Sequence, residues 1–154
     1  MEHILVATDL SERSDRAMYR AFQLAERHGA AITVLNVVDS AFPDDLANKI
    51  RTDTEERLAR YCKSISRHSC ALSVRIADPA LCIQAEADAA DADLIVVGLH
   101  RRRPVADFFK GTTLVRLAAA SPRPLLVVRD PVDQDYRRPV CGLDLSPSSA
   151  AAAR

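Results

Sequence analysis

Five short apolar runs alternate along this chain with longer segments of helical periodicity, and this alternation constrains the fold more than any other feature of the sequence. The apolar runs are His3–Leu10, Ala30–Val38, Cys70–Ile76, Asp93–Gly98 and Pro124–Arg129. Runs of this length that are rich in Val, Ile and Leu are typical of strands buried on both faces. Strands that are joined through helices pair in parallel by right-handed crossovers. The sequence therefore predicts an α/β domain with a doubly wound five-stranded parallel sheet and helices on both faces.

The segments between the runs carry residues that begin and end helices. Helices are predicted over Ser14–His28, Asp44–His68, Pro79–Ala90 and Thr112–Ala120. Gly29 stands where a helix commonly ends in the left-handed conformation, and Asp78 before Pro79 is typical of a helix start. In a doubly wound sheet, ligands bind beyond the carboxyl ends of the strands. We therefore expect a site where the turn after the first run meets the loop that follows Gly98.

The composition argues against several classes of function. The 154 residues are the size of a single domain, and the 21 Lys and Arg balance the 21 Asp and Glu, so no net charge attracts nucleic acid. No apolar run approaches the roughly 20 residues that span a bilayer, and the first residues lack the pattern of a signal peptide. We therefore expect a cytoplasmic protein without nucleic-acid or membrane partners.

The sequence shows no constellation typical of a catalytic or metal centre. Its four cysteines form no CxxC pair and its four histidines show no HxxxH spacing, so we expect buried, reduced thiols and no metal site. Ser11 lies close to Asp9 in sequence but has no assignable histidine partner, which leaves hydrolase chemistry unsupported. Whether the chain is an enzyme stays open at this point, with binding favoured over catalysis.

The end of the chain repeats its beginning. Val140–Ala152 aligns with Leu5–Ala17 at a constant offset of 135 residues, and both segments contain Asp-Leu-Ser. A chance match between segments rich in alanine and serine is the alternative. The polar, proline-bearing segment between the two copies is typical of a linker. We therefore expect a complete domain over residues 1–130, a linker over 131–138 and, over 139–154, the first strand and start of a second, truncated repeat of a tandem protein.

The stretch Val96–Thr113 joins the fourth apolar run to the last predicted helix. Gly111 allows close approach of a ligand to the backbone, and Thr112 and Thr113 open a helix whose N–H groups and dipole favour an anion. Gly111 equally fits a simple turn and Thr112 a simple N-cap, so a phosphate site and a plain helix start both stay open. Lys110 precedes the glycine, so the stretch is not a Walker A loop.

These features together resemble the universal stress protein family. The resemblance rests on ILVATDLS at residues 4–11, DLIVVG at 93–98, GTT at 111–113 and SPRPLLVVR at 121–129. It covers nearly the whole chain and implies a Rossmann-like fold of the adenine nucleotide alpha hydrolase type. It also implies a role in the stress response through nucleotide binding, with ATP, accompanied by Mg²⁺, as the ligand.

Nucleotide-binding members of the family carry Gly-x2-Gly-x9-Gly-(Ser/Thr) after the fourth strand, and this chain matches that motif at Gly98 and at Gly111-Thr112. The resemblance implies that adenine and ribose contact the first two strands and that the phosphates follow the glycine motif. The nucleotide-binding residues implied in this way are Ala7, Thr8, Asp9, Val38, Val97, Gly98, Arg101, Gly111, Thr112 and Thr113. A carboxylate such as Asp9 is also typical of a turn after a buried strand, and both interpretations stay open.

Arg101 stands where the motif has its second glycine, which is the main departure from the family pattern. An arginine takes away room at this point but adds a charge that can pair with phosphate. Arg101 therefore either obstructs the site or becomes a phosphate ligand. A solvated run of Arg101–Arg103 without a specific role is the third alternative.

Three hypotheses for function follow: a nucleotide-binding regulatory domain, a dimerisation or interaction module that has lost ATP binding, and a weak ATPase. The last apolar run, Pro124–Arg129, is expected at a sheet edge, where a strand of this kind needs a partner. Universal stress proteins commonly pair there, so the resemblance implies a homodimer or intramolecular pairing with the second repeat. The sequence does not name a downstream partner.

Overall fold

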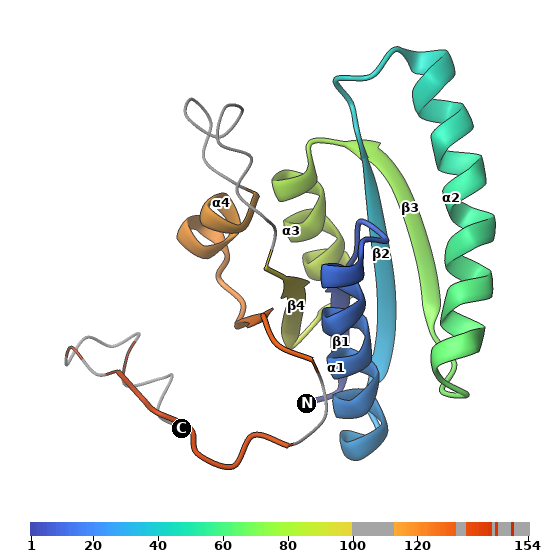
Figure 1. The fold of residues 1–154 in the computed structure, drawn as a ribbon. Coiled ribbons are helices and arrows are strands. Elements are labelled where there is room, and N and C mark those ends of the chain that lie inside the picture. Colours follow the sequence, from blue (N-terminus) through green and yellow to red (C-terminus); the bar gives the residue numbers. More distant parts are fainter. Residues whose placement is uncertain (100–112, 132–134, 143, 145–148, 150–154) are drawn as a thin grey trace.

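A five-stranded parallel sheet forms the centre of the molecule in the computed structural model, which describes residues 1–99, 113–131, 135–142, 144 and 149 (Figure 1). The strands are β1 (His3–Ala7), β2 (Ala31–Asp39), β3 (Ala71–Ala77), β4 (Leu94–Gly98) and β5 (Leu125–Val128). The helices are α1 (Glu12–His28), α2 (Asp44–Ile65), α3 (Pro79–Ala89) and α4 (Thr113–Ala120). The strand order is β3-β2-β1-β4-β5, and all neighbouring strands run parallel. The predicted doubly wound α/β fold is confirmed.

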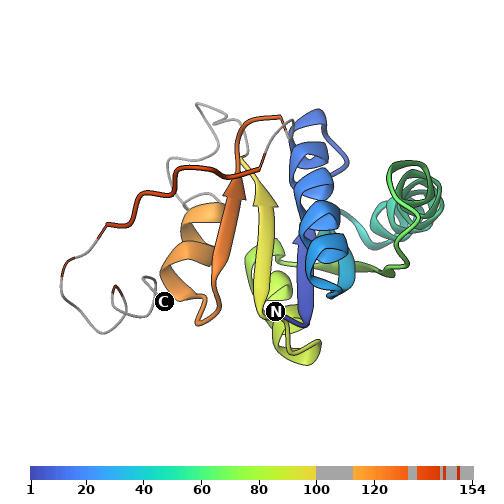
Figure 2. The ribbon, with the colours of Figure 1, turned by 90° about the horizontal axis from the view of Figure 1, so that it is seen from below.

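Each face of the sheet carries its own apolar layer, because successive side chains of a strand point to opposite sides. Helices α1 and α2 cover one face, where Ile4 and Val6 are completely buried. Helices α3 and α4 cover the other face, where Leu5 and Leu35 are completely buried. Figure 2 shows α1 and α4 on opposite sides of the sheet. Burial on both faces explains why the strands read as unbroken apolar runs instead of alternating patterns.

Helix α1 begins at Glu12, two residues earlier than the sequence predicts, because Ser11 is its N-cap. Gly29 ends this helix in the left-handed conformation, with a φ of 64°, as predicted. Helix α3 begins after the N-cap Asp78 with Pro79 in its first turn, also as predicted. In the described part of the chain, none of the helices combines the length and the apolar character that a bilayer crossing requires.

The chain changes direction across the sheet after β3. From β1 it proceeds to β2 and β3 on one side, and it then returns to β4 and β5 on the other side of β1. The connection that leaves β1 leads to α1 on one face, whereas the chain beyond β4 continues to α4 on the opposite face. The carboxyl ends of β1 and β4 therefore lie at the switch point of the sheet, where doubly wound proteins bind ligands.

The segment after β5 lies against α1. Arg27 forms an ion pair with Asp135, and the guanidinium of Arg20 lies 4.2 Å from the centre of the Tyr136 ring. Residues 139–142 are not in a strand, and Val140 is 96% exposed. The described part of the segment expected to begin a second repeat is therefore not paired with this sheet.

The cysteines differ in exposure. Cys62 and Cys82 are buried, Cys70 is half-buried, and all are free thiols. Burial raises the pKa of the Cys62 thiol to about 12, which keeps it protonated and unreactive at neutral pH. Cys141 is exposed, so the expectation of buried thiols throughout is wrong for this residue.

Candidate functional site

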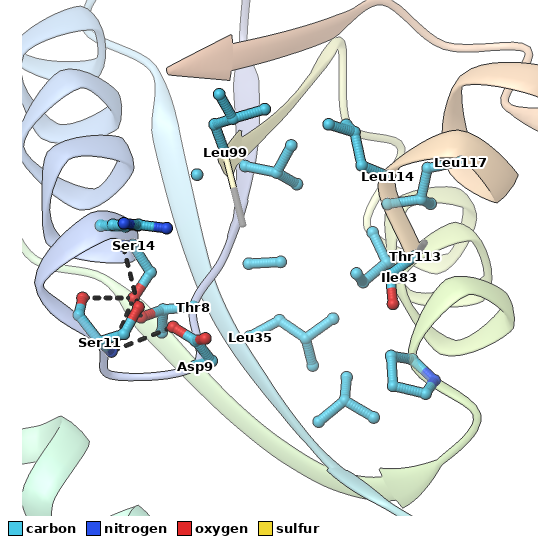
Figure 3. Close-up of a pocket in the computed structure, with 16 residues that line it drawn as sticks. Thr8, Asp9, Ser11, Ser14, Leu35, Ile83, Leu99, Thr113, Leu114 and Leu117 are labelled. Atoms are coloured by element: carbon cyan, nitrogen blue, oxygen red, sulfur yellow. Dashed lines mark hydrogen bonds between the residues drawn. The ribbon is translucent and has the colours of Figure 1, made fainter. Parts of the chain in front are cut away.

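A cavity of about 350 Å³ opens at the carboxyl ends of β1, β2 and β4, at the switch point of the sheet (Figure 3). Its volume falls within the range of small-molecule binding sites. The first turn of α1 forms one wall, and residues of α3 and α4 form the wall opposite. The cavity therefore lies where the order of the strands alone places a ligand.

One half of the cavity is apolar. Its side chains come from β2, α3, β4 and α4, and they are Leu35, Val37, Ile83, Val97, Leu114 and Leu117. Leu35 and Leu117 are almost completely buried beneath the surface of the cavity, so the floor belongs to the hydrophobic core on that face. A floor of this kind suits a flat aromatic or apolar group of a ligand.

The other half is polar. Its side chains are Thr8, Asp9, Ser11, Arg13 and Ser14 from the β1–α1 turn, with Thr113 across the cavity at the start of α4. Figure 3 shows Thr8, Asp9, Ser11 and Ser14 clustered on one side, facing Ile83, Thr113 and Leu117 on the other. A ligand that fits both halves needs an apolar part and a hydrogen-bonding part.

The β1–α1 turn is held by hydrogen bonds among its own residues. The Ser11 N–H donates to Ser14 Oγ at 3.0 Å and the Ser14 N–H donates to Ser11 Oγ at 3.4 Å, which together form a capping box. The Thr8 hydroxyl donates to Ser14 Oγ at 2.9 Å and accepts the Leu10 N–H at 3.0 Å. Leu10 has a φ of 56°, a conformation that bulky residues rarely adopt, and its bond to Thr8 helps to hold it.

Strand β2 supports the turn from the neighbouring position in the sheet. The buried side-chain amide of Asn36 donates to the Thr8 carbonyl at 2.8 Å. The Thr8 N–H donates to the Leu35 carbonyl at 2.9 Å and extends the pairing of β1 with β2 by one bond. Both backbone groups of Thr8 are therefore satisfied inside the protein, so the turn does not need a ligand to hold its shape.

Asp9 both shapes the turn and lines the cavity. Its Oδ1 accepts the Ser11 N–H at 3.0 Å, which closes an Asx turn directly before α1. Asp9 is also the carboxylate that the described lining residues contribute to the cavity. Within the described ranges, no three His, Cys, Asp or Glu side chains come together as a metal site requires. A metal ion bound next to Asp9 would need further oxygen ligands from a bound molecule or from water.

Strand β4 ends at Gly98, and the first turn of α1 packs directly on this glycine. A Cβ atom at position 98 would lie 2.8 Å from the Arg13 carbonyl oxygen and 3.0 Å from the Ser14 Cα. Such distances to backbone atoms are too short for any residue with a side chain. Glycine is therefore required at position 98 by the close packing of β4 against the first turn of α1. This requirement holds with or without a role in ligand binding.

The wall opposite is braced by an ion pair between α3 and α4. Arg116 Nη1 lies 2.7 Å from Asp78 Oδ2, and Asp78 Oδ1 accepts the Leu81 N–H at 3.1 Å as the N-cap of α3. The Arg116 guanidinium and the bond from Leu81 hold the pKa of Asp78 below its usual range. The ion pair joins the first turn of α3 to α4 beside the apolar half of the cavity.

Six of the residues expected to bind nucleotide line the cavity: Ala7, Thr8, Asp9, Val97, Gly98 and Thr113. Arg101, Gly111 and Thr112 lie outside the described residues. Val38 does not line the cavity, because it points to the opposite face of the sheet and is buried beneath α1 and α2. Its neighbour Val37 lines the cavity in its place, since adjacent residues of a strand face opposite sides.

Sequence reasoning missed several lining residues. Arg13 is among them because the predicted helix begins one residue after it. Ser14 is among them because the prediction gives the first residue of that helix no place at the sheet edge. Ile83 and Leu117 come from alanine-rich helices, in which few large side chains mark the buried face. Leu35 and Val37 lie on the same face of β2, because side chains of a strand alternate between its two faces. Assigning one of them to the cavity would therefore have predicted the other.

Comparison with known proteins shows the family. Residues 1–129 match the universal stress protein family. The chain belongs to this family. The universal stress protein A homolog of Haemophilus influenzae is 30% identical over 114 residues, which cover 65% of this chain and 78% of that protein. A universal stress protein of Thermus aquaticus is 28% identical over 134 residues, which cover 82% of this chain and 97% of that protein.

Solved structures of other universal stress proteins share the fold. The protein UspA from Lactobacillus plantarum has a TM-score of 0.66 and 23% identity, and the match covers 83% of this chain and 97% of that one. A universal stress protein in complex with cAMP has a TM-score of 0.63 and 23% identity, covering 83% and 96%. The protein from Archaeoglobus fulgidus in complex with dAMP has a TM-score of 0.60 and 20% identity, covering 82% and 97%. At these identities the likeness establishes the fold.

Proposed function

We propose that this universal stress protein domain binds a nucleotide, with ATP as the ligand, and that it acts as a regulatory domain without dedicated catalysis. The observation that carries the proposal is the cavity at the switch point of the sheet, which is apolar on one half and polar on the other. A purine ring has two apolar faces and suits the floor around Leu35 and Ile83. The ribose and phosphates suit the polar half of the cavity, between the β1–α1 turn and Thr113 at the start of α4.

Two relatives of the same fold support this class of ligand, because one was solved with cAMP and another with dAMP. Both ligands are adenine nucleotides. ATP commonly brings Mg²⁺, which proteins hold through one or two carboxylates together with the phosphates. Asp9 is the residue of the described lining that would serve such an ion. A single carboxylate is enough for an ion that the triphosphate also coordinates. It is too few for a metal ion that the protein holds by itself.

Binding without turnover is proposed because the hydroxyls on the cavity wall are already engaged. The Ser14 hydroxyl donates to the Ser11 carbonyl at 2.9 Å and accepts from Thr8, so its proton and lone pairs serve the turn. The Ser11 hydroxyl accepts the Ser14 N–H as the helix cap. Neither serine has a histidine or cysteine among the described lining residues to activate it as a nucleophile. A weak ATPase activity remains the alternative that a turnover assay would reveal.

The proposal is tested by titrating the purified protein with ATP and Mg²⁺ in a calorimeter, beside the variant Arg101→Gly. We expect saturable binding by the wild type. Weaker binding by the variant would assign Arg101 as a phosphate ligand, since the guanidinium is lost with the substitution. Stronger binding by the variant would assign it as an obstruction, since glycine restores room for the phosphates.

Absence of heat from both proteins, with unchanged thermal unfolding in the presence of ATP, would contradict the proposal. A ligand that binds only the folded state raises the unfolding temperature, so the second measurement does not depend on the enthalpy of binding. A domain that binds no nucleotide in either form would be assigned to the interaction module instead.

We further propose that β5 is a pairing surface for a second copy of the fold, either in another chain or in a second repeat that starts after residue 138. Strand β5 is an outermost strand of the sheet, and its four residues are all apolar. Val127 is 37% exposed on this strand. An exposed apolar edge is a template for pairing, and natural edges without a partner commonly carry lysine or proline. The likeness between Val140–Ala152 and Leu5–Ala17 supports a second repeat as one source of the partner.

Val127→Lys is expected to convert a dimer of this chain into a monomer, because a charged side chain on an edge strand opposes pairing. Sedimentation velocity of both proteins at equal concentrations measures the change. Leu81→Lys is the matched control, since Leu81 is 62% exposed on α3, away from β5. A wild-type protein that sediments as a monomer, or a dimer that Val127→Lys leaves intact, would contradict pairing of two chains through β5.

A further inference from the structure

Arg13, a residue with a guanidinium group, lines the cavity from the first turn of α1. It is the second residue of α1, its side chain is half-buried, and it lines the cavity beside Ser11, Ser14 and Gly98. The backbone of Arg13 is held in place, because its carbonyl packs against Gly98 at the end of β4. The glycine motif of universal stress proteins does not include this position, and Arg13 is not among the residues that the family resemblance implies for nucleotide binding.

Within the part of the chain that the structure describes, the Arg13 guanidinium has no hydrogen-bond or ion-pair partner. The other arginines that are at least half-buried all have one. Arg16 donates to the Arg129 carbonyl and Arg20 to the Gln23 side chain. Arg51, Arg116 and Arg123 pair with carboxylates of Glu55, Asp78 and Asp88. A half-buried guanidinium without a partner has lost part of its hydration and has gained no hydrogen bond in exchange.

An anion in the cavity would supply that partner. Guanidinium groups bind phosphate through two parallel N–H···O bonds, and these bonds are stronger than those between neutral groups. The N-terminal end of α1 adds the positive end of its dipole on the same side of the cavity. Glu12, the acidic neighbour of Arg13, is 91% exposed and pairs with Arg16, so it does not neutralise the guanidinium.

We propose that Arg13 contacts a phosphate group of the ligand and gives the cavity its preference for nucleoside phosphates over free nucleosides. This inference rests on the proposed nucleotide binding and adds the residue that selects the charged part of the ligand. The apolar floor holds the base of a nucleotide and of a nucleoside equally well. Among the described lining residues Arg13 is the cation and Asp9 the carboxylate, so Arg13 is the one whose charge favours the phosphorylated ligand.

The test compares the affinities of ATP, AMP and adenosine for the wild type, Arg13→Gln and Arg13→Lys by calorimetric titration. Arg13→Gln keeps most of the length of the side chain and removes its charge. We expect it to weaken ATP and AMP binding by about 10- to 100-fold, the loss typical of a charge-assisted bond, and to leave adenosine binding unchanged. Arg13→Lys keeps the charge without the two-pronged geometry, so an intermediate loss is expected.

Arg60→Gln is the matched control, because Arg60 is an exposed arginine on α2 whose Nη1 lies 3.9 Å from Glu56. It should bind all three ligands as the wild type does. A second measurement is the dependence of ATP affinity on salt, which should be steeper for the wild type than for Arg13→Gln. Far-UV circular dichroism and thermal unfolding verify that each variant is folded, which is expected since the Arg13 side chain makes no described bond within the protein.

The outcomes separate this inference from the proposed function. Wild-type binding of ATP that Arg13→Gln leaves unchanged would overturn the role of Arg13 and keep nucleotide binding. An equal loss of ATP and adenosine binding in Arg13→Gln would overturn it as well, because the residue would then act on the shape of the cavity. A wild type that binds none of the three ligands would overturn the proposed function and the inference with it.

Discussion

Leu117→Ala is expected to lower the free energy of unfolding by about 2–5 kcal/mol, as removal of a buried leucine commonly does. Leu117 is 1% exposed and is the buried residue of α4, a helix of eight residues. It packs into the apolar layer with residues of β1, β2, α3 and β4, and it also lines the cavity. The substitution therefore removes the main apolar anchor of α4 and widens the cavity at the same time. Urea unfolding followed by circular dichroism measures the change.

Val115→Ala is the control for Leu117→Ala. Val115 lies on the same helix and is 59% exposed, so its truncation should change the stability by no more than about 0.5 kcal/mol. A small effect of Leu117→Ala, similar to that of Val115→Ala, would show that α4 is not docked through Leu117. Reduced ATP affinity in Leu117→Ala, measured on the folded protein, would further indicate that the apolar floor contacts the ligand.

Gly98→Ala is expected to destabilise the protein by about 1–3 kcal/mol, the range typical of overpacking at a closely packed position. The added Cβ meets backbone atoms of Arg13 and Ser14, which cannot rotate away as a side-chain end would. The first turn of α1 and the end of β4 must move apart, and both line the cavity. We therefore expect ATP affinity to fall together with stability, and Gly98→Val to be worse in both respects.

Gly142→Ala is the matched control for Gly98→Ala, since a Cβ atom at position 142 would have no atom within 4 Å. It should unfold at the same denaturant concentration as the wild type. Unchanged stability of Gly98→Ala would mean that α1 and β4 separate easily, and that the close packing at Gly98 is not required for the fold.

The fold could be predicted from the sequence because each of its parts carries a local signal. Runs such as Leu94–Gly98 are short, apolar and bounded by polar residues, and a sheet buried on both faces requires that pattern. The ends of the strands and helices were harder to predict from the sequence. The sequence extends the first strand to Leu10, but β1 ends at Ala7. Thr8 keeps one bond to β2 through its N–H, and its hydroxyl and carbonyl bond to the turn and to the Asn36 side chain. A residue type alone does not reveal where its hydroxyl will bond.

The site could be predicted in part, for a similar reason. Residues at the carboxyl ends of strands, such as Asp9 and Gly98, are brought together by the topology, and topology follows from the order of the elements. Val38 was expected at the site but lies on the face away from the cavity, because an unbroken apolar run does not tell which of two buried faces a residue occupies. Val37 and Val38 differ by one position and lie in different layers. Arg13 was missed because the capping box that places it in α1 uses serine at its third helical position, where glutamate would have been the stronger signal.

The bonds that hold the β1–α1 turn have a consequence for how this cavity can vary. The shape of the turn depends on Thr8, Ser11, Ser14 and Asn36, which bond to one another and to the backbone. Arg13 projects from the same turn without contributing to those bonds. The positive charge of the cavity wall therefore comes from a residue that does not hold the turn, whereas Asp9 contributes a carboxylate and holds it. A substitution at position 13 can change which ligands the cavity attracts while its geometry stays the same. Domains with arginine, lysine, glutamine or glutamate at this position would form a series of cavities of one shape and graded electrostatic preference.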